Sequence, residues 1–528
     1  MINRRAVGDS GKLEVYDTTL RDGAQSEDIS FTVDDKLAVT LILDNLGVHF
    51  IEGGWPGANP KDIEYFDRVR NLKLANAKIV AFGSTHNPKN SAEDDINLKA
   101  LVAAGTEYVT IFGKTWDHHV INALGITLER NLEIIGDSIL FLRKNGKRVF
   151  FDAEHFFDGS KKNSSYATAC LKQAELAGAE RIILCDTNGG CLPSDVGDEI
   201  ALCKNLISVP LGIHAHNDSG CAVASSMEAV DLGAVQVQGT INGFGERCGN
   251  ADLLTLIPNL QLKMEYECIP PEKMSSLKTV CRQINEIANL RNFKHQPFVG
   301  GSAFAHKGGI HVSAVERDPT TYEHVPPESV GNERRFLVSD MSGGATVLNK
   351  AKQFDIVLAP KSDELKSVVA EIKKREHQGY QYESADASLE LLMREHVTGY
   401  IRPFKLIKLK VVNCQELGKL PHNEATVYVE ILGQVEKATL KSYEGPVDAV
   451  NKALRKLLVK RFAYLKSVKL TDYHVRVLNG AGTNTKVLVH CDWTDGKKTW
   501  KTIGVSKDII KASSEASFDS YAYKILIG

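Results

Sequence analysis

Eight short apolar segments alternate with helix-like segments through the first half of the chain, and this alternation constrains the fold more than any other feature. The segments are KLEVYD (12–17), VHFIEG (48–53), KIVAFG (78–83), YVTIFG (108–113), RVFFDA (148–153), RIILCD (181–186), PLGIHAH (210–216) and VQVQGT (235–240). Residues 34–47, 60–72 and 163–178, which lie between them, show apolar residues at helical spacing. The pattern predicts an α/β fold, and eight units within about 240 residues favour a (β/α)8 TIM barrel over an open doubly wound sheet.

The strand rhythm stops after Met274, and this change suggests three domains. Residues 1–274 are expected to form the barrel, and residues 275–400 a helical linker and lid region. Residues 401–528 contain strand-like runs followed by a helix, and then a second such round that closes with a helix from Ser513 toward Ile527. Two similar rounds predict an internally duplicated βββα domain.

Charge and composition exclude several classes of protein. The 64 basic and 66 acidic residues nearly cancel, so no global attraction to nucleic acid or to a membrane surface is expected. From Ile401 onward, 22 basic residues face 12 acidic ones, which indicates either an anion-binding tail or, as we favour, a separate domain of complementary charge. Apolar runs interrupted by charge, and a start without an apolar signal segment, favour a cytoplasmic chain. None of the ten cysteines forms a C-x-x-C pair, so any metal needs other ligands.

Charged residues gather where the first strand ends, in YDTTLRDGAQ. The carboxyl ends of barrel strands carry the chemistry of TIM barrels, so Asp17, Arg21 and Asp22 should lie at one mouth. A carboxylate there can bind a cation, and a guanidinium can stabilise a developing oxyanion. The alternative is a local salt bridge that caps a loop.

Two histidines end the seventh strand, in HAHND. His214 and His216 are two residues apart, so on a strand both imidazoles point to one face and can reach one ion. Together with Asp22 they predict a metal site, although H-x-H is common by chance. Nitrogen and oxygen ligands suit Mn²⁺, Zn²⁺, Co²⁺ or Mg²⁺.

Glycine-rich GTINGFGERCGNADL follows the eighth strand. The spacing of Gly243, Gly245 and Gly249 is not that of a dinucleotide-binding loop. The glycines are expected to turn the backbone sharply and to return Asn250 to the mouth as an oxygen donor. The GKT of TIFGKT lacks the first glycine of a phosphate-binding loop, because Tyr108 stands there.

Two further candidates follow the fifth and sixth strands. Glu154, in FDAEHFFDG, should point into the mouth as a general acid or base, with a solvated carboxylate as the alternative. Thr187, in CDTNG, can donate a hydrogen bond to a substrate carboxylate, or can be only a turn residue.

Taken together, YDTTLRDGAQ, HAHND and NGFGERCGNADL resemble the acyl-CoA-condensing DRE-TIM metallolyases, the family of the 2-isopropylmalate, homocitrate and citramalate synthases. The resemblance covers essentially the whole chain, and GGWPGANPKD (53–62) is similar to the citramalate synthases of the long type.

The resemblance implies a role for each matching residue. Asp22, His214, His216 and Asn250 match the metal-site residues, Arg21 matches the arginine that stabilises the oxyanion, and Glu154 matches the acidic residue beside the substrate. The segment AFAHKGGIHVSA and the following PTTYEHV resemble the part that reaches over the active site of a neighbouring subunit. His306 and Tyr322 are then the expected catalytic pair.

The implied reaction joins acetyl-CoA to pyruvate, with a divalent metal as Lewis acid and a homodimer as the assembly. The alternatives are a 2-isopropylmalate synthase, which takes the larger 2-oxoisovalerate, and a metal-dependent aldolase or lyase on the same barrel. The tail resembles the allosteric domain of this family. Isoleucine is the first choice of effector and leucine the second, with residues 480–487 as the contact loop.

Overall fold

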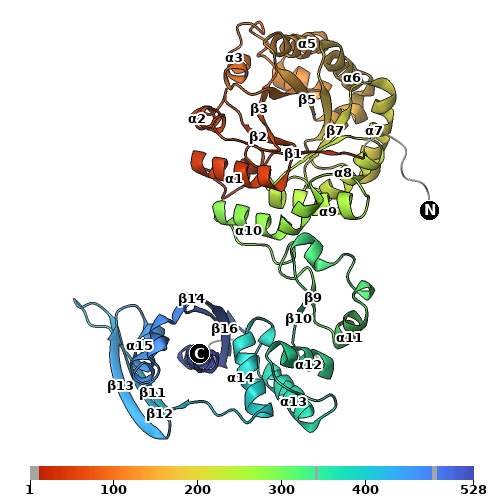
Figure 1. The fold of residues 1–528 in the computed structure, drawn as a ribbon. Coiled ribbons are helices and arrows are strands. Elements are labelled where there is room, and N and C mark those ends of the chain that lie inside the picture. Colours follow the sequence, from red (N-terminus) through yellow and green to blue (C-terminus); the bar gives the residue numbers. More distant parts are fainter. Residues whose placement is uncertain (1–10, 339–342, 479–484) are drawn as a thin grey trace. The chain divides into compact units, whose positions relative to one another are not determined.

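The structure, a computed structural model, describes residues 11–338, 343–478 and 485–528. The chain divides into two compact units. The first is Met1–Phe304 with Val325–Glu333, and the second is Ala305–His324 with Arg334–Gly528. Figure 1 shows the helices and strands of both units.

The first unit is a closed barrel of eight parallel strands in sequence order, so the predicted TIM barrel is confirmed. Each strand pairs with the next along the chain, and β1 closes the barrel on β8. The strands are β1 (Glu14–Asp17), β2 (Phe50–Gly54), β3 (Lys78–Ser84), β4 (Tyr108–Lys114), β5 (Arg148–Glu154), β6 (Arg181–Asp186), β7 (Leu211–Ala215) and β8 (Gln236–Gly239). All eight coincide with the segments singled out in the sequence.

Helices surround the barrel (Figure 1). Helix α1 begins in a reciprocal capping box between Thr32 and Asp35, and ends at Gly47 in the left-handed conformation, with φ of 94°. The helices are α1 (Val33–Leu46), α2 (Pro60–Val69), α3 (Ile96–Ala103), α4 (Asp117–His119), α5 (Leu128–Lys144), α6 (Phe156–Ala177), α7 (Pro193–Leu206), α8 (Ala222–Asp231), α9 (Leu253–Leu262) and α10 (Leu277–Ile287).

The barrel interior is divided into a packed floor and a polar mouth. Tyr16, Phe50 and Phe150 belong to a buried cluster that fills the inside of the barrel. Because side chains two apart on a strand share a face, the next inward positions are Glu52 on β2 and Asp152 on β5. The aromatic floor therefore places the polar chemistry near the carboxyl ends of the strands.

The second unit begins with a pair of two-residue parallel strands and a set of helices. The strands are β9 (Ala305–His306) and β10 (Arg335–Phe336), which pair with each other. The helices are α11 (Gly309–Arg317), α12 (Gly344–Gln353), α13 (Asp363–His377) and α14 (Asp386–Val397).

The tail consists of two similar halves, as the duplicated pattern predicted. The first half is β11 (Phe404–Cys414), β12 (His422–Ile431), β13 (Gln434–Ser442) and α15 (Pro446–Leu458); the second is β14 (Lys469–Val477), β15 (Val487–Thr494), β16 (Thr499–Ser506) and α16 (Ile509–Ile527). Each set of three strands forms an antiparallel sheet in sequence order.

The last helix begins four residues before the expected Ser513. The side chain of Asp508 accepts hydrogen bonds from the backbone N–H groups of Ile510 and Lys511, and this cap starts the helix at Ile509. Among the described residues, no helix is both long and apolar enough to cross a membrane.

A single hydrophobic core joins the tail to the preceding helices. Leu488, Ile503 and Val505 of β15 and β16 are buried with residues of α13 and α14. The α13 and α14 members include Val368, Ile372, Leu389 and Leu392. The helices and the second sheet therefore fold as parts of one unit.

Candidate active site

The segment after β1 separates the roles of two aspartates. The Asp17 carboxylate accepts hydrogen bonds from the backbone N–H and the hydroxyl of Thr19, at 2.9 and 2.8 Å. Burial raises the pKa of Asp17 to about 7, although the hydrogen bonds from Thr19 oppose the shift. Asp17 therefore fixes the turn, and Asp22 is the carboxylate that reaches the mouth.

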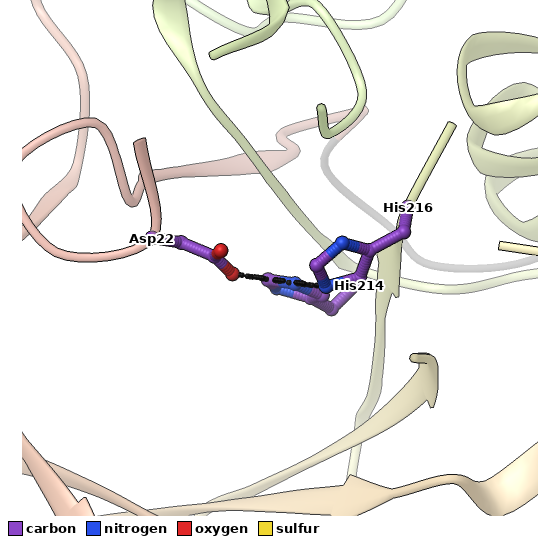
Figure 2. Close-up of side chains that lie close together, drawn as sticks. All are labelled: Asp22, His214 and His216. Carbon is purple, nitrogen blue, oxygen red and sulfur yellow. Dashed lines mark hydrogen bonds and ion pairs between the residues drawn. The ribbon is translucent and has the colours of Figure 1, made fainter. Parts of the chain in front are cut away.

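Asp22, His214 and His216 lie together in a group that could hold a metal ion (Figure 2). The Oδ2 atom of Asp22 is 3.2 Å from His214 Nε2 and 3.8 Å from His216 Nε2, and the two Nε2 atoms are 3.3 Å apart. The side chains are buried, at 3%, 5% and 8% exposure. One carboxylate oxygen and two imidazole nitrogens thus converge on one point, from the segment after β1, from β7 and from the residue that directly follows β7.

Asn250 completes this group from the glycine-rich segment. Its Nδ2 atom is 3.2 Å from Asp22 Oδ2 and 3.1 Å from His214 Nε2. The backbone at Asn250 pairs with that of His216. Gly245 has φ of 151°, and a Cβ there would lie 1.9 Å from Asn250 Oδ1. Only glycine leaves room for the amide at this position.

A donor set of this kind fits a divalent cation. Asp22 Oδ1 and Asn250 Oδ1 are buried without a hydrogen-bond partner. Rotating the Asn250 amide by half a turn exchanges its oxygen and nitrogen, and would turn the oxygen toward Asp22 and His214. Oxygen and imidazole donors in a buried pocket suit Mn²⁺, Mg²⁺, Co²⁺ and Zn²⁺.

The side chains of this group shift one another's pKa values. Burial acts to raise the pKa of Asp22, but the charge of Arg21 and the contact with His214 hold it well below its usual range. Burial, together with the neighbouring His214, lowers the pKa of His216 to about 3. Burial also acts to lower the pKa of His214, but Asp22 outweighs it and raises that pKa. A bound divalent cation needs the carboxylate ionised and both imidazoles neutral, so its charge would have to displace any proton that Asp22 stabilises on His214.

A second ring of polar groups orients His214. Its Nδ1 atom lies 2.8 Å from Gln238 Oε1 on β8, and Gln238 Nε2 donates to Asp152 at 3.3 Å. A histidine that donates from Nδ1 presents the lone pair of Nε2 to an ion. Burial and the charge of Glu52 raise the pKa of Asp152 to about 7.

Arg21 lies beside the metal group, between acidic and aromatic side chains. Its Nε donates to Glu52 at 2.5 Å, and its Nη1 is 3.1 Å from Asp22 Oδ2. The guanidinium lies 3.8 Å from the centre of the Phe82 ring. Phe82 in turn stacks on Phe112 and meets the edge of Trp55. The guanidinium is thus held rigidly at the edge of an aromatic wall.

Glu154 is the last residue of β5, and Thr187 directly follows β6, as expected from their positions in the sequence. The Glu154 carboxylate is 2.5 Å from Lys114 Nζ on β4. The Thr187 hydroxyl oxygen accepts a hydrogen bond from the backbone N–H of His155 at 2.9 Å, which leaves the hydroxyl hydrogen free to donate elsewhere. His155 itself has a left-handed backbone, with φ of 56°.

His306 and Tyr322 belong to the second unit. The His306 Nε2 atom lies 3.1 Å from Glu323 Oε1, and the Tyr322 ring stacks on His311 with 4.2 Å between ring centres. Tyr322 is 46% exposed. Within this unit the two residues have different neighbours, and their role as a catalytic pair stays a prediction.

Sequence reasoning missed three residues that contact the candidates: Glu52, Gln238 and Glu323. Glu52 was visible as the only acidic residue in the apolar segment VHFIEG, where a buried charge signals a partner. Gln238 alternates with apolar residues in VQVQGT, which places it on the inner face. Glu323 follows Tyr322 directly, and no spacing singles it out.

Comparisons with known proteins cover nearly the whole chain. A family model described as HMGL-like matches residues 12–289, one described as homocitrate synthase post-HMGL domain-like matches residues 298–379, and one described as the LeuA allosteric (dimerisation) domain matches residues 383–525. The (R)-citramalate synthase of Geobacter sulfurreducens is 50% identical, with 97% of each chain covered. That of Synechocystis sp. is 49% identical, over 97% of this chain and 96% of the relative. The 2-isopropylmalate synthase of Methanocaldococcus jannaschii is 30% identical, over 96% of this chain and 94% of the relative.

An HMGL-like barrel with a buried carboxylate–imidazole group, followed by a LeuA-type domain, defines an acyltransferase of the DRE-TIM class. Within that class, the chain belongs to the (R)-citramalate synthase family.

Proposed function

We propose that the chain condenses acetyl-CoA with pyruvate and hydrolyses the thioester, giving (R)-citramalate and CoA. The observation that carries the proposal is the buried group of Asp22, His214 and His216 beside Arg21, in a chain 50% identical to an (R)-citramalate synthase over 97% of its length. Citramalate would feed the pyruvate route to isoleucine, so the chain would act in branched-chain amino-acid biosynthesis in the cytoplasm.

The metal residues in this proposal are Asp22, His214, His216 and Asn250, and the ion is Mn²⁺, Mg²⁺, Co²⁺ or Zn²⁺. When bound, a divalent ion supplies Lewis acidity that polarises the keto group of an acceptor. Through its contact with Nδ1, Gln238 would hold His214 with Nε2 available to such an ion.

Arg21 would stabilise the negative charge that forms on the keto oxygen of pyruvate. Glu52 holds its Nε, and the Phe82 ring covers one face, so the guanidinium cannot move away as charge develops. A fixed donor next to an apolar wall stabilises an oxyanion without reorganisation. The large rings of Phe82, Phe112 and Trp55 near Arg21 favour a small acceptor such as pyruvate.

Glu154, His306 and Tyr322 are the proposed acid–base groups. One of them removes a proton from the acetyl methyl group, and the resulting carbanion attacks the keto carbon of pyruvate. Water then cleaves the thioester and releases CoA. Thr187 would donate its hydroxyl hydrogen to the pyruvate carboxylate. In a homodimer, the segment that carries His306 and Tyr322 would serve the site of the partner subunit.

The tail would regulate the reaction. The match of residues 383–525 to the LeuA allosteric (dimerisation) domain supports a dimer with an amino-acid effector, for which isoleucine is the first choice and leucine the second. Of the proposed contact loop 480–487, residues 480–484 lie outside the described residues.

A thiol-release assay with acetyl-CoA and a panel of 2-oxoacids tests the proposal. We expect kcat/KM for pyruvate to exceed that for 2-oxoisovalerate by about tenfold or more, because a pocket shaped to one methyl group rejects a branched chain by about 1–3 kcal/mol. Equal or reversed preference would favour a 2-isopropylmalate synthase. Cleavage of citramalate without any thiol release from acetyl-CoA would favour an aldolase or lyase.

A further inference from the structure

Glu323 is a buried carboxylate that the proposed reaction does not yet use. Its side chain is 2% exposed. Oε1 accepts from Arg334 Nε at 2.6 Å, and Oε2 accepts from Arg334 Nη2 at 2.5 Å. A two-point guanidinium–carboxylate pair of this kind has a fixed geometry. Glu323 is therefore held in one position, and its Oε1 is the atom nearest to His306.

The contact with His306 decides which ring nitrogen carries hydrogen. His306 Nε2 lies 3.1 Å from Glu323 Oε1. Burial acts to raise the pKa of Glu323, but the hydrogen bonds from Arg334 and His306 lower it, so the group is ionised. An ionised carboxylate can only accept, and therefore His306 donates from Nε2. In the neutral ring, Nδ1 then has the free lone pair and is the atom that can take a proton.

The backbone holds His306 in the same position. His306 is the second residue of β9, and it pairs with Phe336 of β10. The backbone N–H of Leu337 donates to the His306 carbonyl at 2.9 Å. Arg334 immediately precedes β10, so the short strand pair fixes both the ring and the guanidinium that secures Glu323.

Several other charged or titratable groups lie on the segments that adjoin or contact β9 and β10. Lys307 pairs with Glu383, and His311 stacks on Tyr322. Helix α12, which contacts β10, carries Lys350, which pairs with Asp386, and Lys352. His324 and Arg335 adjoin the Glu323–Arg334 pair in sequence. Glu323 is the carboxylate that contacts the ring itself.

We propose that Glu323 is a positioning residue that holds His306 with its Nδ1 free to accept a proton and stabilises the imidazolium that results. Arg334 keeps Glu323 ionised and in place. Tyr322, on the neighbouring residue, is outside this arrangement because its ring lies on His311. The inference rests on the proposed function, in which His306 is an acid–base group.

The test compares Glu323→Gln with Glu383→Gln as the matched control, in the full-length enzyme with its metal. Glutamine keeps the shape of the side chain but removes the charge that stabilises the imidazolium. We expect Glu323→Gln to lower kcat about 10- to 100-fold with little change in the KM for pyruvate. A loss in kcat without a loss of affinity separates a positioning role from general damage to the fold. Glu383→Gln should keep the wild-type kcat and KM.

A double variant separates positioning from a purely structural role. If Glu323 acts through His306, Glu323→Gln should add little to the loss caused by His306→Ala. The inference would be overturned if the losses of the two single variants multiplied in the double variant, or if Glu323→Gln raised the KM for pyruvate and left kcat unchanged. So would full activity of His306→Ala. If the wild-type enzyme released no thiol with pyruvate, the proposed function itself would be wrong. A failure of the inference about Glu323 can therefore be told apart from a failure of the proposed function.

Discussion

The position of a single residue at the barrel mouth could be predicted where the alternation of a strand placed a reactive side chain on the inner face. His214 and His216 are two apart at the end of a strand, so the structure brings them to one point with Asp22. Glu52 was not predictable in the same way, because its partner Arg21 lies 31 residues away on another strand connection. Pairings between distant segments depend on barrel closure, which a local pattern does not encode.

The metal assignment is testable on single residues. His214→Ala should remove one nitrogen ligand and, with it, most of the bound metal and the condensation activity, while the barrel stays folded. The measurement is metal content per chain after dialysis, together with thiol release and circular dichroism.

His474→Ala is the matched control, because His474 is exposed in the tail, at 55% of its side chain, and contacts only Asp472 among the ion pairs of the described residues. A His214→Ala enzyme that retains a full equivalent of metal would contradict the assignment.

At the scale of elements, the strands and the order of the barrel followed from the sequence, whereas one helix start did not. The last helix was expected to start at Ser513, but the structure begins α16 at Ile509 behind the cap of Asp508. The polar side chains that obscured the helix face inward: Ser513, Ser514 and Ser517 donate to backbone carbonyls four residues earlier. Serines can be buried when their hydroxyl groups bond to carbonyls of the same helix. Such serines interrupt the helical spacing of apolar residues on which the prediction relied.

The side chain of Asp44, on α1, binds the backbone of residues 75–77, and this contact gives a prediction for stability. The Asp44 carboxylate accepts hydrogen bonds from the backbone N–H groups of Ala75, Asn76 and Ala77, at 2.8 to 3.0 Å. Asp44→Asn should lower the free energy of unfolding by about 1–3 kcal/mol at pH 7, because an amide cannot accept all three bonds as well as a carboxylate. Chemical denaturation checks this, with the exposed Asp137→Asn as the control.

The stabilisation by the Asp44 carboxylate should decrease in acid. Burial acts to raise the pKa of Asp44, but the three N–H donors lower it below the ordinary value. A carboxyl whose pKa is lower in the folded state adds stability above its unfolded pKa and loses it as the pH falls through the folded one. The difference between wild type and Asp44→Asn should therefore shrink below about pH 4. A constant difference down to pH 2 would contradict this account.

At the scale of the whole molecule, the change of rhythm after Met274 and the duplicated tail were visible in the sequence. The expected boundaries at residues 274/275 and 400/401 stay predictions. The shared core of α13, α14, β15 and β16 was not visible, since its members are separated by about a hundred residues of other structure.

Regulation by the tail can be tested by removing it. Deleting residues from Ile401 onward should abolish inhibition by isoleucine while leaving some condensation of acetyl-CoA with pyruvate, because every proposed metal ligand and acid–base group precedes Ile401. Inhibition curves on full-length and truncated enzyme give the answer. Unchanged inhibition after truncation would place the effector site in the first 400 residues.

The shared core predicts how the truncated enzyme will behave. The deletion removes Leu488, Ile503 and Val505 from the core that α13 and α14 complete. The cost can be measured first in the full-length chain, where Ile503→Ala should reduce the free energy of unfolding by about 2–5 kcal/mol. Hydrogen exchange should then quicken in α13 and α14 as well as in β16. Faster exchange confined to β16 would mean that the helices do not depend on this core.

The division of the chain places His306 and Glu323 in the same folding unit as the duplicated tail, apart from the barrel that carries the metal group. Anyone who builds a hybrid from two relatives would therefore do better to exchange material after Phe304 than near residue 400. A graft made at the earlier point carries the histidine, its carboxylate and the regulatory sheets together, as one inherited module. The loop Val325–Glu333 belongs to the barrel and should come from the parent that supplies the metal ligands.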